Sequence, residues 1–146
     1  MKSENQVVLE FPSRSSNEAF ARVAAAGFAM QLDPTLEELG DIKTAVSEAV
    51  TNAIVHGYPE NFGRIVMKLR IREGNILEIV VKDWGVGIAD VEQARKPMFT
   101  TGNDERSGMG FTIMESFMDK LKVKSVPGKG TTVIMLRTIR QRRAFR

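Results

Sequence analysis

The spacing of apolar residues changes once along the chain, and this change limits the possible folds more than any other feature. Before residue 58, apolar residues recur every three to four positions, which predicts helices over 17–31 and from about 34 to 56. After residue 64 they alternate with polar residues, which predicts strands over 65–72, 76–83, 119–126 and 131–139. An earlier alternating stretch over 5–11, ended by Pro12, predicts an edge strand.

Each predicted strand after residue 64 has one apolar face and one face rich in lysine and arginine. In the first of them, Ile65 and Met67 share one face, and Lys68 and Arg70 share the other. An antiparallel sheet with helices on one side and water on the other produces this pattern. We therefore predict an α+β fold, a two-layer sandwich in which helices cover one face of a mostly antiparallel sheet.

The basic face of this sheet has two interpretations, a solvated surface or a nucleic-acid site. The second would use Lys68, Arg70, Lys82, Lys120, Lys122 and Lys124. No aromatic residues alternate with these lysines to stack on bases, and the net charge of +3 is small. The solvated surface is favoured, and no direct binding of nucleic acid is expected.

Local signals predict where the helices and turns begin and end. Ser16 or Asn17 is expected to cap the first helix and Asp33 the second. Gly57 is expected to end the second helix. The pair "GN" at 74–75 predicts a two-residue hairpin turn.

Length and composition narrow the class of protein. At 146 residues, the chain is expected to be a single domain over 1–146. It has no cysteine, which excludes disulfides and thiolate metal sites. No apolar run reaches the ~18 residues that a membrane span needs, and the N-terminus lacks the apolar core of a signal peptide. A cytoplasmic protein without a membrane partner is expected.

Three polar residues lie in one line along the second helix. Glu48, Asn52 and His56 are spaced four apart, so they stack at the border of the apolar stripe. That stripe consists of Ile42, Ala45, Val46, Ala49, Val50 and Ala53. A carboxylate beside an amide oxygen suits Mg²⁺ that keeps several waters and a phosphate. The alternative is a buried hydrogen-bond network that only fixes the helix.

Three glycine-containing segments follow, and each alone is compatible with an ordinary turn. Asp83 ends a strand before Gly85 and Gly87, where its carboxylate could accept from an exocyclic amine such as that of adenine. Gly108 and Gly110 precede a helix that begins near Phe111, which is an arrangement suited to anions. The polar segment 97–108 between them is predicted to be a lid. In "PGKGTT", over 127–132, a glycine turn leads into a strand that begins with Thr131 and Thr132.

The order of these motifs resembles the Bergerat fold of gyrase-type ATPases, heat-shock protein 90 chaperones, histidine kinases and mismatch-repair ATPases. No Walker motif is present, so a P-loop is excluded. The resemblance implies one ATP·Mg²⁺ site in which "DWGVG" lies on the adenine side and "GMG" on the phosphate side. His56 is the only histidine and lies in the nucleotide helix itself, which argues against a histidine kinase.

Within this superfamily, the chain is most similar to the anti-sigma F factors, serine-protein kinases of spore-forming bacteria. The similarity covers nearly the whole chain and rests on "QLDPTLEEL", "DIKTAVSEAVTNAIVHGY" and "ERSGMGFTIMESFMD". It implies that Glu48 is the base for the target serine, that Asn52 ligates Mg²⁺, and that Asp83 binds the adenine amine. The remaining implied ATP-binding residues are Gly85, Gly87, Thr100, Thr101, Arg106, Ser107, Gly108, Met109, Gly110, and Thr131 or Thr132, which would reach adenine through a water. Trp84 replaces a residue that is more often acidic and is expected to alter the wall of the cleft.

The resemblance also implies partners. These are an RNA polymerase sigma factor, an anti-anti-sigma protein that carries the phosphoacceptor serine, and a second copy of the chain. Glu18 and Arg22, one helical turn apart, are either a dock for the sigma factor or a solvated ion pair. An ATP-gated binding protein without kinase activity is the alternative within the same fold.

Overall fold

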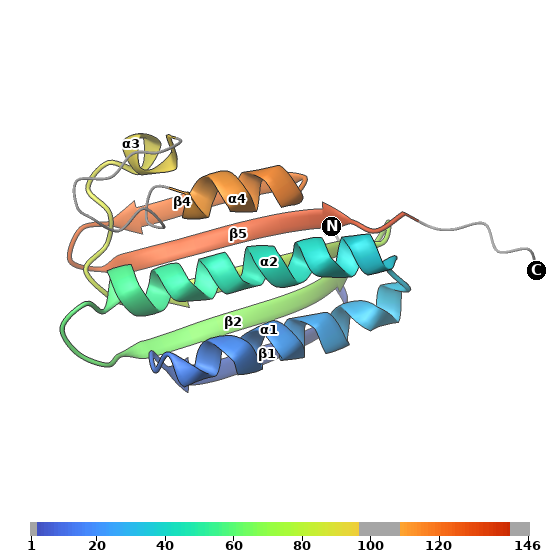
Figure 1. Cartoon of the computed structure of the whole chain (residues 1–146), viewed down its shortest axis with the longest axis horizontal. Coiled ribbons are helices and arrows are strands. Elements are labelled where there is room, and N and C mark those ends of the chain that lie inside the picture. Colours follow the sequence, from blue (N-terminus) through green and yellow to red (C-terminus); the bar gives the residue numbers. More distant parts are fainter. Residues whose placement is uncertain (1–2, 97–108, 141–146) are drawn as a thin grey trace, which may run out of the picture.

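Five antiparallel strands form one layer of the structure, and helices cover one face of that layer (Figure 1). The computed structural model describes residues 3–96 and 109–140. The strands lie in the order β1-β2-β3-β5-β4. Their bounds are Ser3–Pro12 for β1, Arg64–Arg72 for β2, Ile76–Asp83 for β3, Lys120–Val126 for β4 and Gly130–Thr138 for β5. The predicted α+β sandwich and the predicted edge strand at the N-terminus are confirmed.

The helical layer consists of α1 and α2 packed side by side, with α4 next to α2 (Figure 1). The helices are α1 (Ser16–Ala29), α2 (Leu36–Asn52), α3 (Val91–Arg95) and α4 (Gly110–Phe117). A short 3₁₀ turn, η1 (Met30–Leu32), follows α1, and a π-helical turn, η2 (Ala53–Gly57), extends α2. The short helix α3 was not predicted, whereas the end of the long helix at Gly57 is confirmed. None of the helices among the described residues is long and apolar enough to cross a membrane.

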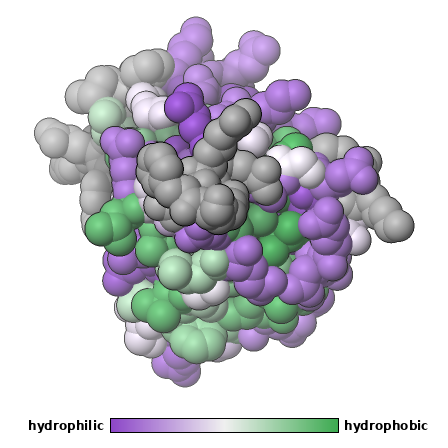
Figure 2. Space-filling view, turned by 90° about the vertical axis from the view of Figure 1, so that its right-hand side faces the viewer, coloured by the Kyte–Doolittle hydropathy of each residue, from purple (hydrophilic) through white to green (hydrophobic). Residues whose placement is uncertain are grey.

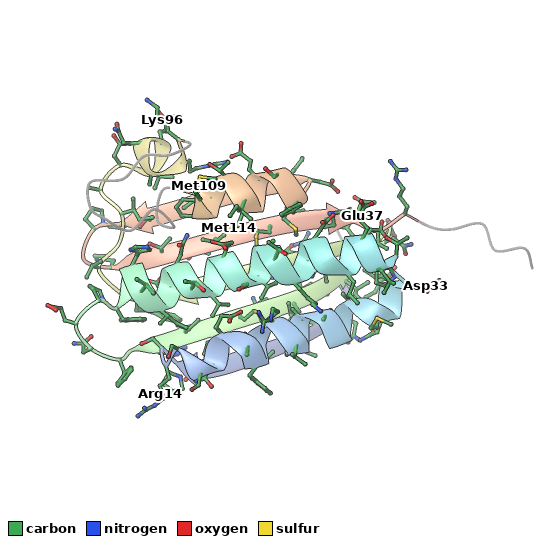
Figure 3. All side chains as sticks on the ribbon, viewed as in Figure 1. Arg14, Asp33, Glu37, Lys96, Met109 and Met114 are labelled. Carbon is green, nitrogen blue, oxygen red and sulfur yellow. The ribbon has the colours of Figure 1, made fainter. Side chains whose placement is uncertain are left out.

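The core lies between the two layers and uses the faces that the sequence pattern predicts. Every member of the apolar stripe of α2 is buried, as are Ile65, Met67, Leu69, Leu77, Ile79 and Val81 on the facing side of the sheet. From α4, the fully buried Met114 lies between α4 and α2 (Figure 3). This packing holds the N-terminal end of α4 beside the C-terminal end of α2, which positions the candidate site.

The helix caps differ from the predicted ones. Ser15, not Ser16 or Asn17, occupies the cap position of α1, and no side-chain hydrogen bond from the part of the chain that the structure describes caps that helix. Thr35 caps α2 through a capping box, in which its hydroxyl accepts from Glu38 N and the Glu38 carboxylate accepts from Thr35 N. Asp33 instead ends η1 in a left-handed conformation, with a φ of 53°. The Thr35–Glu38 pair prevails because it satisfies two free backbone donors at once.

The hairpin between β2 and β3 is one residue longer than predicted. Gly74 and Asn75 both have positive φ, as the pair "GN" predicts. However, the last paired residues are Arg72 and Ile76, so Glu73 also belongs to the turn. The Asn75 carbonyl accepts from Ile139 N, which ties the turn to the end of β5.

The face of the sheet away from the helices is more mixed than the sequence pattern suggests. Lys82, Lys120, Lys122 and Lys124 are exposed there, as predicted. Glu78, however, is buried on this face between Arg70 and Arg72 and forms ion pairs with both. The one Glu78 carboxylate therefore offsets part of the positive charge of these two arginines within the sheet.

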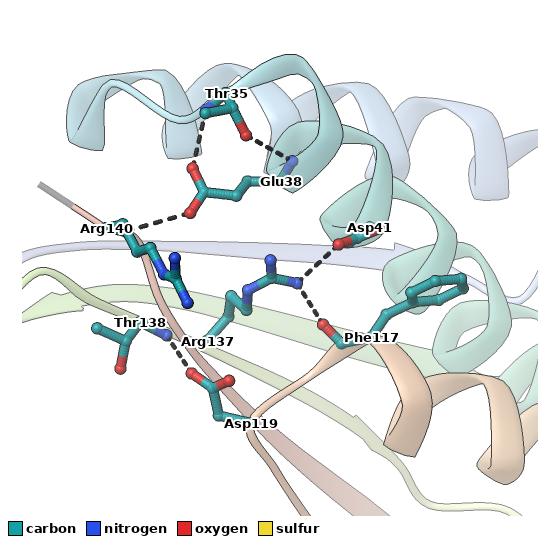
Figure 4. A network of polar contacts seen from close by, with 8 residues as sticks. All are labelled: Thr35, Glu38, Asp41, Phe117, Asp119, Arg137, Thr138 and Arg140. Carbon is teal, nitrogen blue, oxygen red and sulfur yellow. Dashed lines mark hydrogen bonds and ion pairs between the residues drawn. The ribbon is translucent and has the colours of Figure 1, made fainter. Parts of the chain in front are cut away.

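A polar network joins the end of β5 to the start of α2 (Figure 4). Arg137 donates through Nη1 to Asp41 Oδ2 at 3.0 Å and to the Phe117 carbonyl at 2.5 Å. Glu38 accepts from Arg140 N at 3.1 Å in addition to its role in the capping box. Figure 3 places Asp33 and Glu37 at this end of the molecule, which faces the viewer in Figure 2, where apolar and polar side chains are interspersed.

Candidate functional site

A pocket of about 190 Å³ opens between the two layers, where α2 and η2 meet β3, β5 and α4. Its walls are apolar, and include Ala49, Val81 and Phe111. Four polar side chains that the sequence singled out lie on it, namely Asn52, His56, Asp83 and Thr131. An apolar slot with a few convergent polar groups is the usual form of a small-molecule site.

Asp83 is the buried acceptor of this pocket. Its residue is 5% exposed, and its Oδ1 accepts from Gly85 N at 2.9 Å and from Thr131 N at 3.3 Å. Burial raises the pKa of the Asp83 carboxyl, although the hydrogen bonds from Gly85 and Thr131 act in the opposite direction. Both of these bonds go to Oδ1, which leaves Oδ2 available to accept from a ligand amine.

Three glycines from separate segments surround Asp83. A Cβ on Gly57 would lie 3.0 Å from the Asp83 carboxyl carbon, and one on Gly130 would lie 2.1 Å from the Asp83 carbonyl oxygen. A Cβ on Gly85 would lie 1.9 Å from the Gly57 carbonyl oxygen. Only glycine permits these close approaches, so the end of η2, the loop after β3 and the start of β5 converge around Asp83.

The loop after Asp83 is tied down by hydrogen bonds to both of its neighbours. Val86 N donates to the Gly57 carbonyl at 2.9 Å, and Gly128 N donates to the Val86 carbonyl at 2.7 Å. Gly87 adopts a φ of 77°, and a Cβ there would lie 2.3 Å from the Val126 carbonyl oxygen. Gly85 and Gly87 therefore shape the loop, and Gly87 also lines the pocket.

Trp84 lies outside the pocket lining, so the expectation that it alters the cleft wall is wrong. The guanidinium of Arg64 lies 4.2 Å from the ring centroid and the Lys82 ammonium 4.9 Å. The Tyr58 hydroxyl accepts from Trp84 N at 2.7 Å and donates to the Arg64 carbonyl at 2.6 Å. Trp84 turns away from the pocket because it follows the inward-facing Asp83 and so points to the opposite side.

Thr131, and not Thr132, is the threonine that lines the pocket. Thr131 pairs with Asp83 across β3 and β5, and side chains of successive residues point to opposite faces of a strand. The Thr131 hydroxyl lies 2.7 Å from the Ser125 hydroxyl. The choice that the sequence left open is thus resolved by the register of the sheet.

Asn52 lies at the other end of the pocket, against the first turn of α4. A Cβ on Gly110 would lie 3.1 Å from both Oδ1 and Nδ2 of Asn52. Met109 precedes this turn, and no side-chain hydrogen bond caps the helix within the described residues. The free backbone N–H groups of a helix start beside an amide oxygen suit a phosphate together with a hydrated cation.

Glu48 lies one helical turn before Asn52 but outside the main pocket. It lines an adjoining polar hollow together with Glu18, Asn52 and His56. Glu18 and Arg22 form an ion pair with Oε2 and Nη1 3.6 Å apart. The predicted line of Glu48, Asn52 and His56 therefore spans the two hollows, while the ion pair of α1 lies at the edge of the second.

Five of the predicted ATP-binding residues, Thr100, Thr101, Arg106, Ser107 and Gly108, lie outside the described residues, as does the predicted lid over 97–108. Met109 and Gly110 are described and lie at the start of α4, and their place on the phosphate side stays a prediction. No cluster of three or more acidic, histidine or cysteine side chains that could hold a metal occurs within 3–96 and 109–140. The one amide oxygen of Asn52 fits a cation that keeps most of its water ligands.

Curated relatives match almost the full length of the chain. The anti-sigma F factor of Thermoanaerobacter sp. (strain X514) is 56% identical over 140 residues, which are 95% of this chain and 97% of the relative. The anti-sigma F factor of Clostridium acetobutylicum is 57% identical over 133 residues, 90% of this chain and 92% of the relative. That of Geobacillus kaustophilus is 54% identical over 142 residues, with 97% of each chain covered. The chain belongs to the anti-sigma F factor family.

Comparisons with a family model and with solved structures agree on the fold of this chain. The histidine kinase-like ATPase domain matches residues 11–137. The RsbU and RsbW domains of a Mycobacterium tuberculosis protein align with a TM-score of 0.68 at 17% identity, covering 92% of this chain and 32% of that one. A mycobacterial sensor histidine kinase aligns with a TM-score of 0.56 at 22% identity, covering 70% of this chain and 72% of that one. The predicted Bergerat fold is confirmed.

Sequence reasoning missed several residues that shape the site in this family member. Gly57 was interpreted only as a helix stop, yet it packs against Asp83. Tyr58 and Ser125 were not singled out, although each bonds two separate segments. A helix-end glycine followed by an aromatic residue was a weak signal for the first two. Ser125 carries no local signal, because its partners come from β5 and from the loop after β3.

Proposed function

We propose that this chain binds ATP together with Mg²⁺ and transfers the γ-phosphoryl group to a serine of an anti-anti-sigma protein, and that it holds a sporulation sigma factor of RNA polymerase. The observation that carries the ATP site is the buried Asp83 carboxylate, whose two hydrogen bonds both go to Oδ1, in an apolar slot that Asn52 and Phe111 of α4 also line. Family membership supports the serine kinase and the sigma partner.

Each residue has a distinct role under this proposal. Asp83 accepts a hydrogen bond from the adenine amine, and Thr131 supports the same edge of the base. The first turn of α4, with Met109 and Gly110, donates backbone N–H groups to the phosphates. Asn52 offers its amide oxygen to Mg²⁺, which when bound neutralises charge on the phosphates.

Glu48 takes the proton of the target hydroxyl under this proposal. Its place in the hollow beside Asn52, outside the base slot, leaves it accessible to a protein substrate. Phosphoryl transfer depends mostly on positioning and charge neutralisation, so the α4 turn and Asn52 supply most of the effect. A general base typically adds ~10²–10⁴-fold.

The remaining expectations are part of the same proposal. The chain acts as one domain over 1–146, in the cytoplasm, and as a homodimer. On α1, Phe20 is 60% exposed and Val23 is 65% exposed, which supports a protein-binding surface on that helix. Glu18 and Arg22 lie on the same helix and are proposed to contact the sigma factor.

Glu48→Gln tests whether the protein is a kinase or only an ATP-gated binding protein. We expect this variant to bind ATP with unchanged affinity by calorimetry and to lose at least ~10²-fold in the rate of label transfer to the anti-anti-sigma serine. Lys43→Gln is the matched control on the same helix, because Lys43 is exposed and lies outside the slot. Transfer by the Glu48→Gln protein at the unmodified rate would exclude Glu48 as the base.

A further inference from the structure

The Ser125 hydroxyl makes three polar contacts beside the pocket. Neither the sequence motifs nor the proposed mechanism gives this residue a role. It accepts from Ile88 N at 2.7 Å, donates to the Gly130 carbonyl at 3.0 Å and lies 2.7 Å from Thr131 Oγ1. Ser125 itself does not line the pocket, whereas Ile88 and Thr131 do. Any influence on a ligand must therefore pass through these two residues.

The proton count of the contact determines which way Thr131 points its own proton. A serine hydroxyl has one proton and two lone pairs. Ile88 N–H occupies one lone pair, and the Gly130 carbonyl can only accept, so it takes the Ser125 proton. The remaining Ser125 lone pair then accepts from Thr131. In this arrangement all of the contacts are satisfied, and the oxygen of Thr131, a residue that lines the pocket, keeps its lone pairs to accept from a ligand or a water.

We propose that Ser125 is a positioning residue that fixes the Thr131 hydroxyl as an acceptor and thereby sets how the site reads the N1 atom of adenine. The proposal rests on the proposed ATP site. Adenine offers an amine proton and, beside it, the N1 acceptor. Asp83 accepts the amine proton, and a water that donates both to Thr131 and to N1 completes the edge. The pairing of Ser125 with Thr131 across β4 and β5 holds this acceptor in register with Asp83 on β3.

A competing explanation is that Ser125 only ties the loop after β3 to the sheet through Ile88 N. Loss of that tie would weaken every nucleotide to the same extent. A role through Thr131 would instead weaken only the part of the affinity that depends on N1. The two explanations are separated by comparing ATP with 1-deaza-ATP, which lacks the N1 acceptor and keeps the amine.

The experiment measures both affinities by calorimetry for the full chain and for a matched pair of variants, Ser125→Thr and Ser125→Val. These have nearly the same shape, but only threonine keeps the hydroxyl. We expect the unmodified chain and Ser125→Thr to bind ATP about 2–10-fold more tightly than 1-deaza-ATP, the range of one hydrogen bond. For Ser125→Val this preference should fall by at least half. Ser13→Ala, which removes a hydroxyl that accepts from Gly63 N away from the pocket, should leave the preference unchanged.

Two further measurements keep the outcomes distinct. In a Thr131→Val background, Ser125→Val should have no additional effect on the preference, because Ser125 acts through Thr131. If valine at 125 prevents folding, as judged by thermal melting, Ser125→Ala replaces it. An unchanged preference in the folded variant, or equal weakening of both nucleotides, overturns the role of Ser125. Failure of the unmodified chain to bind ATP would overturn the proposed function instead.

Discussion

At the scale of single residues, the burial of Asp83 depends on three neighbouring glycines, which have no side chains. Gly57, Gly85 and Gly130 have no side chains, and the space this leaves lets three backbone segments approach one another around Asp83. The carboxylate is buried, and its burial raises its pKa. Such a group lowers the stability of the folded protein when it is ionised, and carboxyls of this kind are frequent at functional sites.

Asp83→Asn should separate binding from stability. Loss of the carboxylate acceptor should weaken ATP by about 1–3 kcal/mol. Because the folded pKa of Asp83 is raised, the folded chain holds this proton more tightly than the unfolded chain does, and the ionised form costs stability above that pKa. The variant should therefore melt at a higher temperature than the unmodified chain at pH 7, and the difference should shrink as the pH falls through the raised pKa.

Calorimetry with ATP and thermal melting between pH 4 and 7 test this prediction. Asp119→Asn is the control, because Asp119 is exposed and accepts only from Thr138 N outside the pocket. Unchanged ATP affinity in Asp83→Asn would remove Asp83 from the base site. A variant that melts lower at pH 7 would show that burial of the charge is not the dominant effect.

Gly110 contributes to the phosphate end of the site in a similar way. Alanine there would place a Cβ 3.1 Å from the Asn52 amide and displace it. We expect Gly110→Ala to weaken ATP·Mg²⁺ about 10-fold or more and to leave adenosine binding unchanged. The control is Gly40→Ala in α2, where a Cβ meets nothing within 4 Å. That change should raise the free energy of unfolding by about 0.5–1 kcal/mol, and equal weakening of adenosine by Gly110→Ala would contradict the assignment.

At the scale of elements, the sequence was a good guide to which segments are helix or strand and a poorer one to how they end. The period of apolar residues reports burial on one face, so α2 and the strand pair β2–β3 could be predicted. The cap at Thr35 was missed because Asp33 is also a strong capping residue. The choice between them depends on the left-handed turn that η1 makes at Asp33.

The capping box of α2 is expected to make stability depend on acid. Burial acts to raise the pKa of Glu38, but the backbone N–H groups of Thr35 and Arg140 outweigh it and lower the pKa. A lowered folded pKa means that the stability from Glu38 is fully present above its ordinary value of 4.5 and is lost as the pH falls through the folded pKa. The network in Figure 4 should therefore loosen below pH 4.5.

Chemical denaturation of Glu38→Gln and Thr35→Ala at several pH values tests this. Thr35→Ala should lower the free energy of unfolding by about 1 kcal/mol at pH 7. Glu38→Gln should be less stable than the unmodified chain at pH 7 and approach it in acid. A gap that stays constant across this pH range would rule out ionised Glu38 as the source.

Some residues of the candidate site could be predicted from local sequence patterns, and others could not. Asn52 and Asp83 could be found because their types and positions relative to the apolar pattern are unusual. The selection of Thr131 over Thr132 required the register of β3 with β5. Ser125 could not be found, because its partners are brought together only when β4, β5 and the loop after β3 pack.

At the scale of the whole molecule, α1 has an apolar face that no other part of the described chain covers. Phe20 and Val23 are exposed there, while Ala21, Ala25 and Phe28 face the core. Phe28 is covered within the chain, but Phe20 and Val23 remain exposed. Glu18 and Arg22 pair at 3.6 Å beside this surface.

Arg22→Glu tests the proposed sigma dock on this face. The ion pair is partly exposed, so its loss should change the free energy of unfolding by less than about 1 kcal/mol. Sigma binding should weaken at least 10-fold, measured by surface plasmon resonance, while ATP affinity is unchanged. Lys43→Glu, the same charge reversal on the neighbouring helix, is the control for net charge. Normal sigma binding by Arg22→Glu would leave Glu18 and Arg22 as an ordinary ion pair.

The pairing of Asp83 on β3 with Thr131 on β5 also determines at which stage of folding the pocket can form. β2 and β3 are joined by a short turn, and so are β4 and β5, whereas the Asp83–Thr131 contact joins residues 48 positions apart. Contacts between distant residues close a long loop and form slowly. We expect the two hairpins to form first and the pocket to arise only when they join. Contacts that form after the transition state act on unfolding alone, so bound nucleotide should slow unfolding and leave the folding rate unaltered.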